Sequence, residues 1–494
     1  MRHGKLSGFG VPSLLALGLG LWGITREHSM WRDEAATWQA AHRSLGELAH
    51  MVGQADVVHG LYYALMHGVF ALFGDSLLTL RLPSVLAAAT ACGLTGLLGT
   101  RLAGHRVGMG AGLALAVVPA VQEQAQEGRS YALVLALVVL ETWLFVEILA
   151  RRGSWRWTWY AGTALFAAWL HWFSLLALVA HGVTLVCVRP GRAQWTRWGL
   201  AAAGAVVGTL PVILTSRTQV ALVSWIAPLG WSTVLGMSGI IAFAALCARL
   251  SRGGPAGGAH HDGPGPGVSL AAVALPLCAV PQLSLALVSL VQPLYLTRYV
   301  LFTYVGLALL IGALLGTLGT RLRTPARVLL PATVALALLV LLPLELRLRT
   351  VGSRVDDVLT AATTVGRVRG SADGVLYVPA AHRDTALVSP GEFAGLRDLA
   401  LAQSPVESGT LKGVEATPQA IERAMLGARR IVLVTDPGPQ RSPSVRDLTK
   451  QRVLAERFTL RSDVVERGRR ISVYERRPPD RPARHPDTGP LPAP

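Results

Sequence analysis

The sequence predicts an α-helical polytopic membrane protein with about eleven transmembrane helices and a C-terminal α/β soluble domain. Of its 494 residues, 51% are hydrophobic and only 15% are charged, and the mean hydropathy is +0.44. Soluble domains carry about 25% charged residues, so this composition excludes an ordinary soluble protein. Long apolar runs separated by arginine-rich connections continue to about residue 350. Short helix and strand patterns replace them after that point.

The formal net charge of +17 does not indicate a nucleic-acid partner. The arginines lie in short clusters between apolar runs, not on one amphipathic face, so we interpret them as topology determinants and contacts to membrane lipids. Arginine greatly outnumbers lysine, which is typical of a GC-rich bacterial coding sequence and predicts a bacterial plasma membrane. All four cysteines lie inside apolar runs, so no disulfide framework is expected at the outer face.

Eleven apolar runs are candidates to cross about 30 Å of hydrocarbon. The first run follows Arg2 and Lys5 as in a signal peptide, but no small-x-small cleavage site follows it, so we expect a retained anchor. The runs are 8–25, 81–103, 107–121, 130–150, 157–171, 173–188, 196–214, 232–250, 269–291, 299–319 and 327–345.

Loop charges predict the orientation. With the N-terminus in the cytoplasm, the inner loops hold the arginine clusters and the outer loops hold chiefly Arg129, Arg217 and Arg298. Residues 57–74 are apolar enough to span, but counting them would invert every later loop. We therefore predict an amphipathic helix at the outer interface, with His59, Tyr62, Tyr63 and His67 as its polar edge.

The same topology places the C-terminal domain outside the membrane. The expected domains are 1–350 in the membrane, an extracytoplasmic α/β domain at 351–477, and a disordered Pro-rich tail at 478–494. Within the α/β domain the patterns predict helices at 355–365, 418–426 and 445–458. They also predict strands at 374–378 and 431–435 and a hairpin of 459–465 with 470–475. The inner loop 251–267 contains His260 and His261, which fit low-complexity sequence better than a metal site.

An acidic pair, Asp33 and Glu34, follows the first apolar run between Trp31 and Trp38. At the outer face such a carboxylate can take a proton from an acceptor hydroxyl as it attacks a sugar carbon. The spacing fits a solvated acidic first turn of a helix equally well, because the helix dipole favours acids there. Asp56 is a further carboxylate in the same loop, and alone it is typical of a helix cap.

The loop before the run at 130–150 is the most polar connection of the membrane half. It carries Gln126, Glu127, Arg129 and Tyr131. The planar fork of Arg129 can pair with a lipid phosphate, or the side chain can be a snorkelling anchor beside Glu127. The pattern supports both interpretations.

Two further outer turns carry candidate residues. His171 could serve as a metal ligand or base, although a lone histidine is more often structural. Arg298 and Tyr299 lie at another outer helix end. A second arginine on the face of Arg129 favours a phosphate or diphosphate site.

Other classes of function leave signatures that this sequence lacks. It has no Walker motif, no Gly-rich nucleotide loop and no zinc-type Cys/His spacing, so neither a nucleotide cofactor nor an ATP-driven pump is expected. The alternative is a transporter of lipid-linked sugar or polymer, or a scaffold without catalytic activity. Such a transporter should show functional charges within its spans, and Glu141 in the run at 130–150 is the acid that the enzyme hypothesis leaves unexplained.

Four segments together resemble a known family. Trp31-Arg-Asp-Glu-Ala-Ala-Thr37, Asp56-Val-Val-His-Gly-Leu-Tyr-Tyr63, Leu80-Arg-Leu-Pro-Ser84 and Ala125-Gln-Glu-Gly-Arg-Ser-Tyr131 are similar to the family 39 type of integral-membrane glycosyltransferases of the C superfamily. That group includes protein O-mannosyltransferases and aminoarabinose transferases. The resemblance covers residues 8–190, extends to Thr297-Arg-Tyr299, and leaves the C-terminal domain undefined.

The resemblance implies inverting transfer of a sugar, mannose by default, from a polyprenyl-phosphate donor to an extracytoplasmic protein, glycolipid or cell-envelope polymer. It implies Asp33 as the catalytic base, with Glu34 binding the acceptor or orienting the base, and Asp56 at a position where relatives can bind a divalent metal ion. His59-Gly60 replaces two prolines and Gly128 replaces an alanine, which affects acceptor shape and metal use. The implied donor phosphate contacts are Arg129, Arg298 and Tyr299, and the implied pocket residues are His59, Tyr62, Tyr63, Gln126, Glu127, Tyr131 and His171.

Overall fold

The computed structural model describes residues 2–150, 155–252, 268–439 and 443–478. It divides into two compact units. The membrane unit comprises residues up to Val355 together with Gly409–Leu411, and the α/β unit comprises the remainder. His260, His261 and the tail from 479 onward lie outside the described residues, so the predictions made for them stay predictions.

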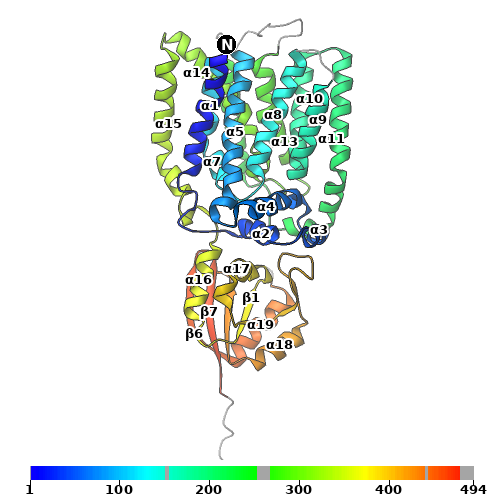
Figure 1. Ribbon diagram of the computed structural model, residues 1–494, viewed down its shortest axis with the longest axis vertical. Helices are drawn as coiled ribbons and strands as arrows, with labels where there is room; N and C mark the ends of the chain where they lie inside the picture. The colour runs from blue at the N-terminus through cyan, green and yellow to red at the C-terminus, as the bar shows by residue number, and fades with distance from the viewer. Residues whose placement is uncertain (1, 151–154, 253–267, 440–442, 479–494) are drawn as a thin grey trace, which may run out of the picture. The chain divides into compact units, whose positions relative to one another are not determined.

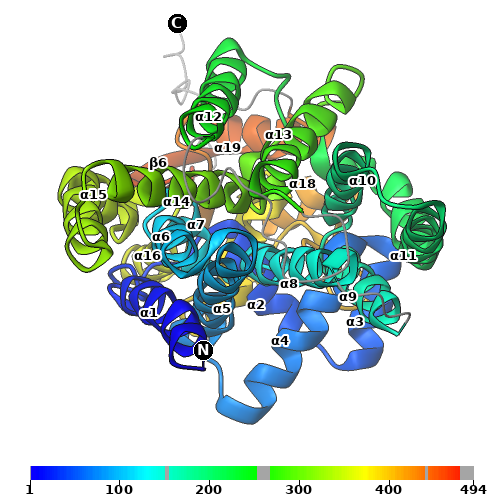
Figure 2. The ribbon, with the colours of Figure 1, turned by 90° about the horizontal axis from the view of Figure 1, so that it is seen from above.

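Each of the eleven apolar runs forms a helix in the membrane unit, which confirms the predicted fold class (Figures 1 and 2). Within the described ranges, seven helices are long and apolar enough to cross a membrane, and the number of eleven crossings stays a prediction. The helices are α1 (Arg2–Leu21), α5 (Leu77–Ala103), α6 (His105–Ala116), α8 (Tyr131–Ala150), α9 (Arg156–Leu170), α10 (Leu176–Val188), α11 (Arg192–Thr218), α12 (Trp231–Leu250), α13 (Leu270–Val288), α14 (Thr303–Arg321) and α15 (Ala326–Leu348).

Short helices lie at the end of the bundle opposite the N-terminus of α1 (Figure 1). We call this the α2–α4 end. The segment predicted as an interfacial helix at 57–74 forms η1 and α4 there. The short elements are α2 (Arg32–Ala41), α3 (Leu45–Gln54), η1 (Val57–His59), α4 (Gly60–Phe73), α7 (Pro119–Ala125), η2 (Trp172–Leu175), η3 (Val220–Val223), η4 (Thr297–Val300) and η5 (Val351–Ser353).

Small residues let the central helices approach closely. A Cβ added to Gly96 of α5 would collide with the backbone carbonyl of Gly8 in α1, and one on Gly108 of α6 would collide with that of Gly96. Such small-residue contacts are a common way to pack helices in lipid, where the hydrophobic effect does not drive association. They bring α1, α5 and α6 together behind the α2–α4 end.

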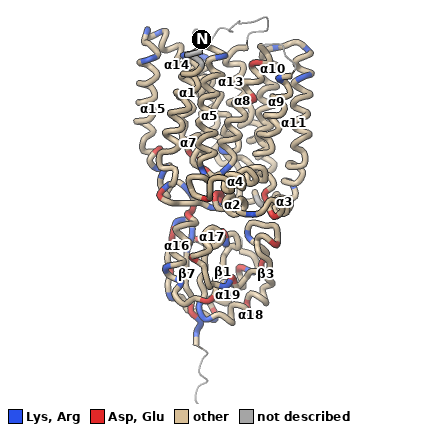
Figure 3. Tube along the Cα trace, in the orientation of Figure 1, with Lys and Arg blue, Asp and Glu red and all other residues tan. Residues whose placement is uncertain are grey.

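Lysine and arginine gather at the ends of the bundle and leave its middle almost uncharged (Figure 3). Glu141 of α8 is an exception, and the structure explains it. Its Oε1 lies 3.4 Å from Nδ1 of His181 on α10, and the hydroxyl of Tyr160 on α9 lies 2.9 Å from the same nitrogen. Glu141 thus joins three helices through buried polar contacts and lines no cavity among those described.

The α/β unit has a five-stranded sheet in the order β2-β1-β5-β7-β6. Strands β2, β1 and β5 are parallel, and β7 pairs antiparallel with β5 and β6. The predicted strands and helices are present, whereas β2–β4 and α17 were not predicted. The elements are α16 (Val358–Val368), β1 (Gly374–Val378), η6 (Ala380–Arg383), α17 (Asp384–Val388), η7 (Pro390–Phe393), β2 (Arg397–Asp398), β3 (Leu401–Gln403), β4 (Val414–Glu415), α18 (Pro418–Gly427), β5 (Arg430–Thr435), α19 (Val445–Arg457), β6 (Phe458–Glu466) and β7 (Arg469–Arg476).

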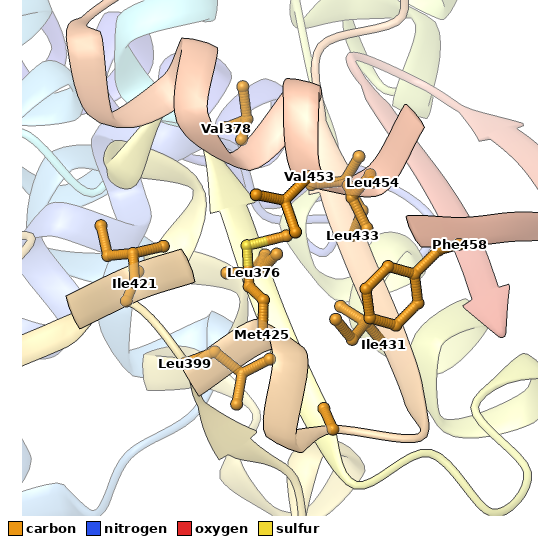
Figure 4. Packing of buried hydrophobic residues seen from close by; sticks show 12 residues of the cluster. Leu376, Val378, Leu399, Ile421, Met425, Ile431, Leu433, Val453, Leu454 and Phe458 are labelled. Atoms are coloured by element: carbon orange, nitrogen blue, oxygen red, sulfur yellow. The ribbon is translucent and has the colours of Figure 1, made fainter. Parts of the chain in front are cut away.

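Alternation along the central strands builds a core on each face of the sheet. Leu376 and Val378 of β1 pack with α18 and α19 (Figure 4), whereas Val375 and Tyr377 pack with α16. Successive side chains of a strand point to opposite faces, so the buried residues of β1 and β5 are covered on both sides. This burial stabilises an α/β unit with its own cores.

Truncation of the α18–α19 core should destabilise the α/β unit. Leu454→Ala removes a side chain that is 3% exposed and should lower the local unfolding free energy by about 2–5 kcal/mol. Hydrogen exchange of the β5 amides in the intact protein measures this loss. Leu448→Ala on the same helix, where the side chain is 50% exposed, is the control, and equal acceleration by both variants would contradict the assigned core.

Candidate functional site

Asp33 and Glu34 are adjacent in α2 but have different environments. Trp31 is the N-cap residue of α2, and its side chain makes no capping hydrogen bond. The two acids occupy the first turn of the helix, where the helix dipole favours them. Consecutive side chains of an α-helix point about 100° apart. Glu34 is completely buried, whereas Asp33 lines a cavity. The pair therefore consists of one structural and one accessible carboxylate.

Glu34 is held by two arginines from separate segments. Its Oε2 lies 2.5 Å from Nη2 of Arg26, while Arg81 contacts Oε1 through Nε and Oε2 through Nη2, both at 2.7 Å. The backbone N–H of Gly128 also donates to Oε1, at 3.1 Å. Burial raises the pKa of Glu34, but the two arginines outweigh it and lower the pKa to about 2. Of the two roles predicted for Glu34, binding the acceptor or orienting the base, its burial and its contacts favour the second, because they position α2.

Glu127 joins the same cluster and is equally buried. It accepts a hydrogen bond of 2.5 Å from Nε1 of Trp31 and one from Nε of Arg354, and its Oε1 lies 3.3 Å from Nη1 of Arg26. Burial raises its pKa, and the neighbouring Glu34 acts in the same direction. We call Arg26, Glu34, Arg81, Glu127 and Arg354 the ion cluster. Contrary to expectation, Glu127 belongs to this cluster and does not line the cavity.

The ion cluster also holds a strained turn between α1 and α2. Arg26, Glu27 and His28 have φ of 46°, 56° and 62°, a left-handed conformation that costs non-glycine residues about 1–2 kcal/mol each. Arg81 donates hydrogen bonds of 2.6 Å to the carbonyls of Ile24 and Ser29, on either side of this turn. The turn then leads directly into α2 and fixes where Asp33 lies.

Two other predicted pocket residues are structural. The side-chain amide of Gln126 donates to the carbonyls of Gly20 and Trp22, at 2.9 and 2.7 Å, and so ties its loop to the end of α1. Tyr62 is fully buried. Neither residue is among those that line the cavity, because both face the protein interior.

A chain of hydrogen bonds leads from Asp56 to Arg129. Asp56 contacts Nδ1 of His59 at 2.7 Å and accepts a hydrogen bond from the Tyr63 hydroxyl. Nη1 of Arg129 donates to that hydroxyl at 3.0 Å, and its Nη2 lies 3.9 Å from Oδ2 of Asp33. Burial raises the pKa of Asp56, but His59, Arg129 and the Tyr63 hydroxyl together hold it well below its usual range. Asp56 therefore positions Arg129 through Tyr63.

Arg298 reaches Asp33 from the other side. Its Nη2 lies 3.2 Å from Oδ2 of Asp33. Four aromatic rings surround its guanidinium group, with centroids 5.6–5.9 Å from Cζ. Cation–π contact with such rings holds the planar group in one orientation. The rings belong to Trp31, Tyr131, Trp225 and Tyr299.

The predicted histidines and tyrosines form a cluster beside the two arginines. The His171 ring lies 4.6 Å from that of Tyr299 and 5.5 Å from that of Tyr131, and the His59 ring lies 5.9 Å from His171. Nε2 of His59 and Nδ1 of His171 are buried without a hydrogen-bond partner among the described residues. The structure thus brings together residues that lie far apart in the sequence.

The implied metal site at Asp56 does not fit the residues around it. The described part of the chain contains no group of three or more His, Cys, Asp or Glu side chains that could hold a metal ion. The carboxylate oxygens of Asp56 already contact His59 and Tyr63. We therefore derive no chemical step through a metal ion.

Asp33 and Arg298 line a cavity of about 730 Å³ at the α2–α4 end. Ligand pockets have about 300–1,000 Å³, so this cavity is large enough for a sugar phosphate. Its lining includes both charged and aromatic side chains. Its walls are formed by Trp31, Arg32, Asp33, Ala120, Glu123, Gln124, Trp225, Leu296, Thr297, Arg298, Leu301 and Val355.

The sequence did not identify several residues that build the site. Trp225 and Gln124 line the cavity without belonging to a recognisable motif. Arg26, Arg81 and Arg354 form the ion cluster, and one signal for them was available. Arginines are rare in loops on the outer side, so each one predicted there needs a buried acid or a ligand as its partner.

Comparisons with known proteins identify the fold. No protein-family model and no curated protein matches the chain. The structure of ArnT from Cupriavidus metallidurans in the apo state has a TM-score of 0.63 at 14% sequence identity, over 94% of this chain and 97% of that one. ArnT bound to undecaprenyl phosphate has a TM-score of 0.52 at the same identity, over 94% and 98%. The chain therefore has the ArnT fold, as the sequence resemblance predicted.

Loss of the Glu34 charge should destabilise the membrane unit. Glu34→Gln leaves the buried Arg26 and Arg81 without their shared anion, and breaking a buried pair costs about 3–5 kcal/mol. Thermal unfolding of the purified protein in detergent should show a clearly lower midpoint. Glu47→Gln is the matched control, because Glu47 is exposed in a capping box that glutamine also supports. Equal midpoints for the two variants would rule out the structural role.

Proposed function

We propose that this protein is a membrane glycosyltransferase that moves a sugar from a polyprenyl-phosphate donor to an acceptor. The observation that carries the proposal is the position of Asp33, which lines a cavity of about 730 Å³ together with Arg298. Its Oδ2 lies 3.2 Å from Arg298 and 3.9 Å from the buried Arg129. The ArnT fold and the undecaprenyl phosphate in one ArnT structure support a polyprenyl-phosphate ligand.

The two arginines provide the binding site for the donor phosphate. Guanidinium groups bind phosphate oxygens through paired N–H donors, and Tyr63 and the aromatic rings already orient both groups. Negative charge grows on the phosphate as the sugar–phosphate bond breaks. Preorganised cations in a site of low dielectric constant stabilise this charge more in the transition state than in the ground state. Tyr299 lies beside Arg298 and belongs to the same phosphate site.

Asp33 acts as the general base in a single displacement. The acceptor hydroxyl gives its proton to the carboxylate, its oxygen forms a bond to the anomeric carbon, and the bonding pair of the sugar–phosphate bond leaves with the polyprenyl phosphate. One displacement inverts the anomeric configuration. The side chain of Asp33 is partly exposed and lines the cavity, so its carboxylate can be reached by an incoming hydroxyl.

We further propose that the α2–α4 end faces the outside of a bacterial plasma membrane, with the N-terminus in the cytoplasm. The arginine distribution predicts this orientation. The donor sugar is mannose in this proposal, and the acceptor is a protein, a glycolipid or a cell-envelope polymer. A donor activated on its lipid carrier needs no nucleotide, which fits a site outside the cytoplasm.

A transfer assay tests the proposal against a transporter or scaffold. Purified protein is incubated with radiolabelled polyprenyl-phosphate mannose and a membrane extract as the source of acceptors. The proposal predicts label in an acceptor fraction. Binding of the donor without any transfer would favour the alternative.

Asp33→Asn should abolish transfer. The amide is similar in size but cannot accept the proton, and a general base contributes about 10²–10⁴-fold to the rate. We expect kcat to fall by that factor while the variant remains in the membrane fraction. Asp75→Asn is the control, since Asp75 is half exposed and contacts only His42 among the ion pairs of the described residues. Unchanged kcat in Asp33→Asn would reject Asp33 as the base.

Arg298→Lys should weaken donor binding. Lysine keeps the charge but loses the planar fork and its contacts with the aromatic rings, so KM for the donor should rise by about tenfold or more, the equivalent of about 1.4 kcal/mol. Initial rates at varied donor concentration measure the change. Arg217→Lys, at an exposed position near the end of α11, should leave KM unaltered. A normal KM in Arg298→Lys would remove Arg298 from the donor site.

A further inference from the structure

A second cavity of about 290 Å³ lies between α12, α13, α14 and the segment before η4. It shares Thr297 with the charged cavity that holds Asp33 and Arg298. Thr297, directly before Arg298 in the sequence, is thus part of the wall of both cavities. The smaller cavity therefore lies next to the proposed position of the donor phosphate.

Six of the nine residues that line the smaller cavity carry a hydroxyl or amide group, although most of the exposed wall is apolar. The described residues along it include no Asp, Glu, Lys or Arg. Hydroxyl and amide groups come from α12, α13, α14, η4 and the segment between α13 and η4. These groups belong to Ser232, Thr233, Gln282, Tyr295, Thr297 and Tyr304.

One pair of these groups has a defined orientation. Nε2 of Gln282 donates to the carbonyl of Cys278 at 2.9 Å, which leaves its Oε1 directed toward the Tyr295 hydroxyl at 3.5 Å. That distance is at the long limit for a hydrogen bond, so both groups keep capacity for a ligand. Both residues are at least nine-tenths buried.

The hydroxyl and amide groups of the lining favour one of two possible occupants. A polyprenyl chain would cover the hydroxyl and amide groups with hydrocarbon, and each polar group that loses its hydrogen bonds in this way costs about 1–3 kcal/mol. A sugar ring offers hydroxyl groups that can replace those hydrogen bonds. The volume equals roughly ten water molecules at about 30 Å³ each, which suits one monosaccharide.

We propose that this cavity is the subsite for the donor sugar and that it selects an uncharged monosaccharide. The inference rests on the proposed function, which places the donor phosphate at Arg298. The sugar then lies beyond Thr297 and its anomeric carbon lies near Asp33. The cavity has no acid to pair with the ammonium group of an amino sugar and no base to pair with the carboxylate of a uronic acid, so it excludes both.

Two hydroxyl deletions test the assignment by direct binding. Thr233→Val and Tyr304→Phe each remove one hydroxyl and keep the shape of the side chain. We expect the dissociation constant for polyprenyl-phosphate mannose to rise about three- to tenfold in each variant, the usual effect of one neutral hydrogen bond. Sugar-free polyprenyl phosphate should bind as tightly as to the wild type. Thr90→Val is the control, because Thr90 is exposed on α5 and its hydroxyl donates to the carbonyl of Leu86 in the same helix.

The other outcomes overturn the proposal. Equal weakening of both lipids would mean that the cavity holds the carrier chain, and unchanged binding of both would mean that the donor does not enter it. Because binding is measured without turnover, these results stand even if the wild type transfers no sugar. Absence of transfer from every donor would reject the proposed function, whereas normal transfer with unchanged donor affinity in both variants would reject the sugar subsite alone.

A charge introduced into the cavity tests the selectivity. Thr233→Asp supplies a carboxylate that can pair with an ammonium group, so the affinity ratio of an amino-sugar donor to the mannose donor should rise at least about tenfold. The same ratio in Thr90→Asp serves as the reference. An unchanged ratio in Thr233→Asp would show that the sugar does not lie beside Thr233.

Discussion

The ion cluster is the constraint on which the α2–α4 end depends. Three arginines and two glutamates are buried there, and their desolvation is costly unless each charge is paired and hydrogen-bonded. The five residues come from the turn after α1, from α2, from α5, from the loop before α8 and from the segment after α15. Since one misplaced partner would leave a buried charge unpaired, the cluster holds these distant segments in one arrangement.

This arrangement separates the roles of two neighbouring acids. The carboxylate of Glu34 is hydrogen-bonded to Arg26 and Arg81 of the cluster and fixes α2. As a result Asp33, one residue earlier, lines the cavity. The strained turn at Arg26–His28 sets the point at which α2 begins. A rigid helix with one end anchored in this way can hold a base within hydrogen-bonding reach of a substrate, which is the geometric requirement for proton transfer.

The two arginines that face Asp33 are oriented by different means. Arg129 is held through Tyr63 by Asp56, whereas Arg298 is held by aromatic rings from four segments. Both means fix the plane of the guanidinium group, and Nε of each arginine has no hydrogen-bond partner among the described residues. Thr297 belongs to the wall of both the charged cavity and the uncharged cavity, for which we propose a phosphate and a neutral sugar as ligands.

The sequence by itself determined the helical fold class, the apolar runs and most α/β elements, because hydrophobic periodicity and composition are local properties. It also indicated Asp33, Arg129, Arg298 and Asp56, which lie in short polar segments between apolar runs. Only the tertiary structure decided that Glu34 and Glu127 are buried counter-ions and that Gln126 and Tyr62 face the interior. Burial and pairing are set by segments far apart in the chain, such as Arg354 with Glu127, so no local pattern could distinguish the accessible carboxylate of Asp33 from the structural one beside it.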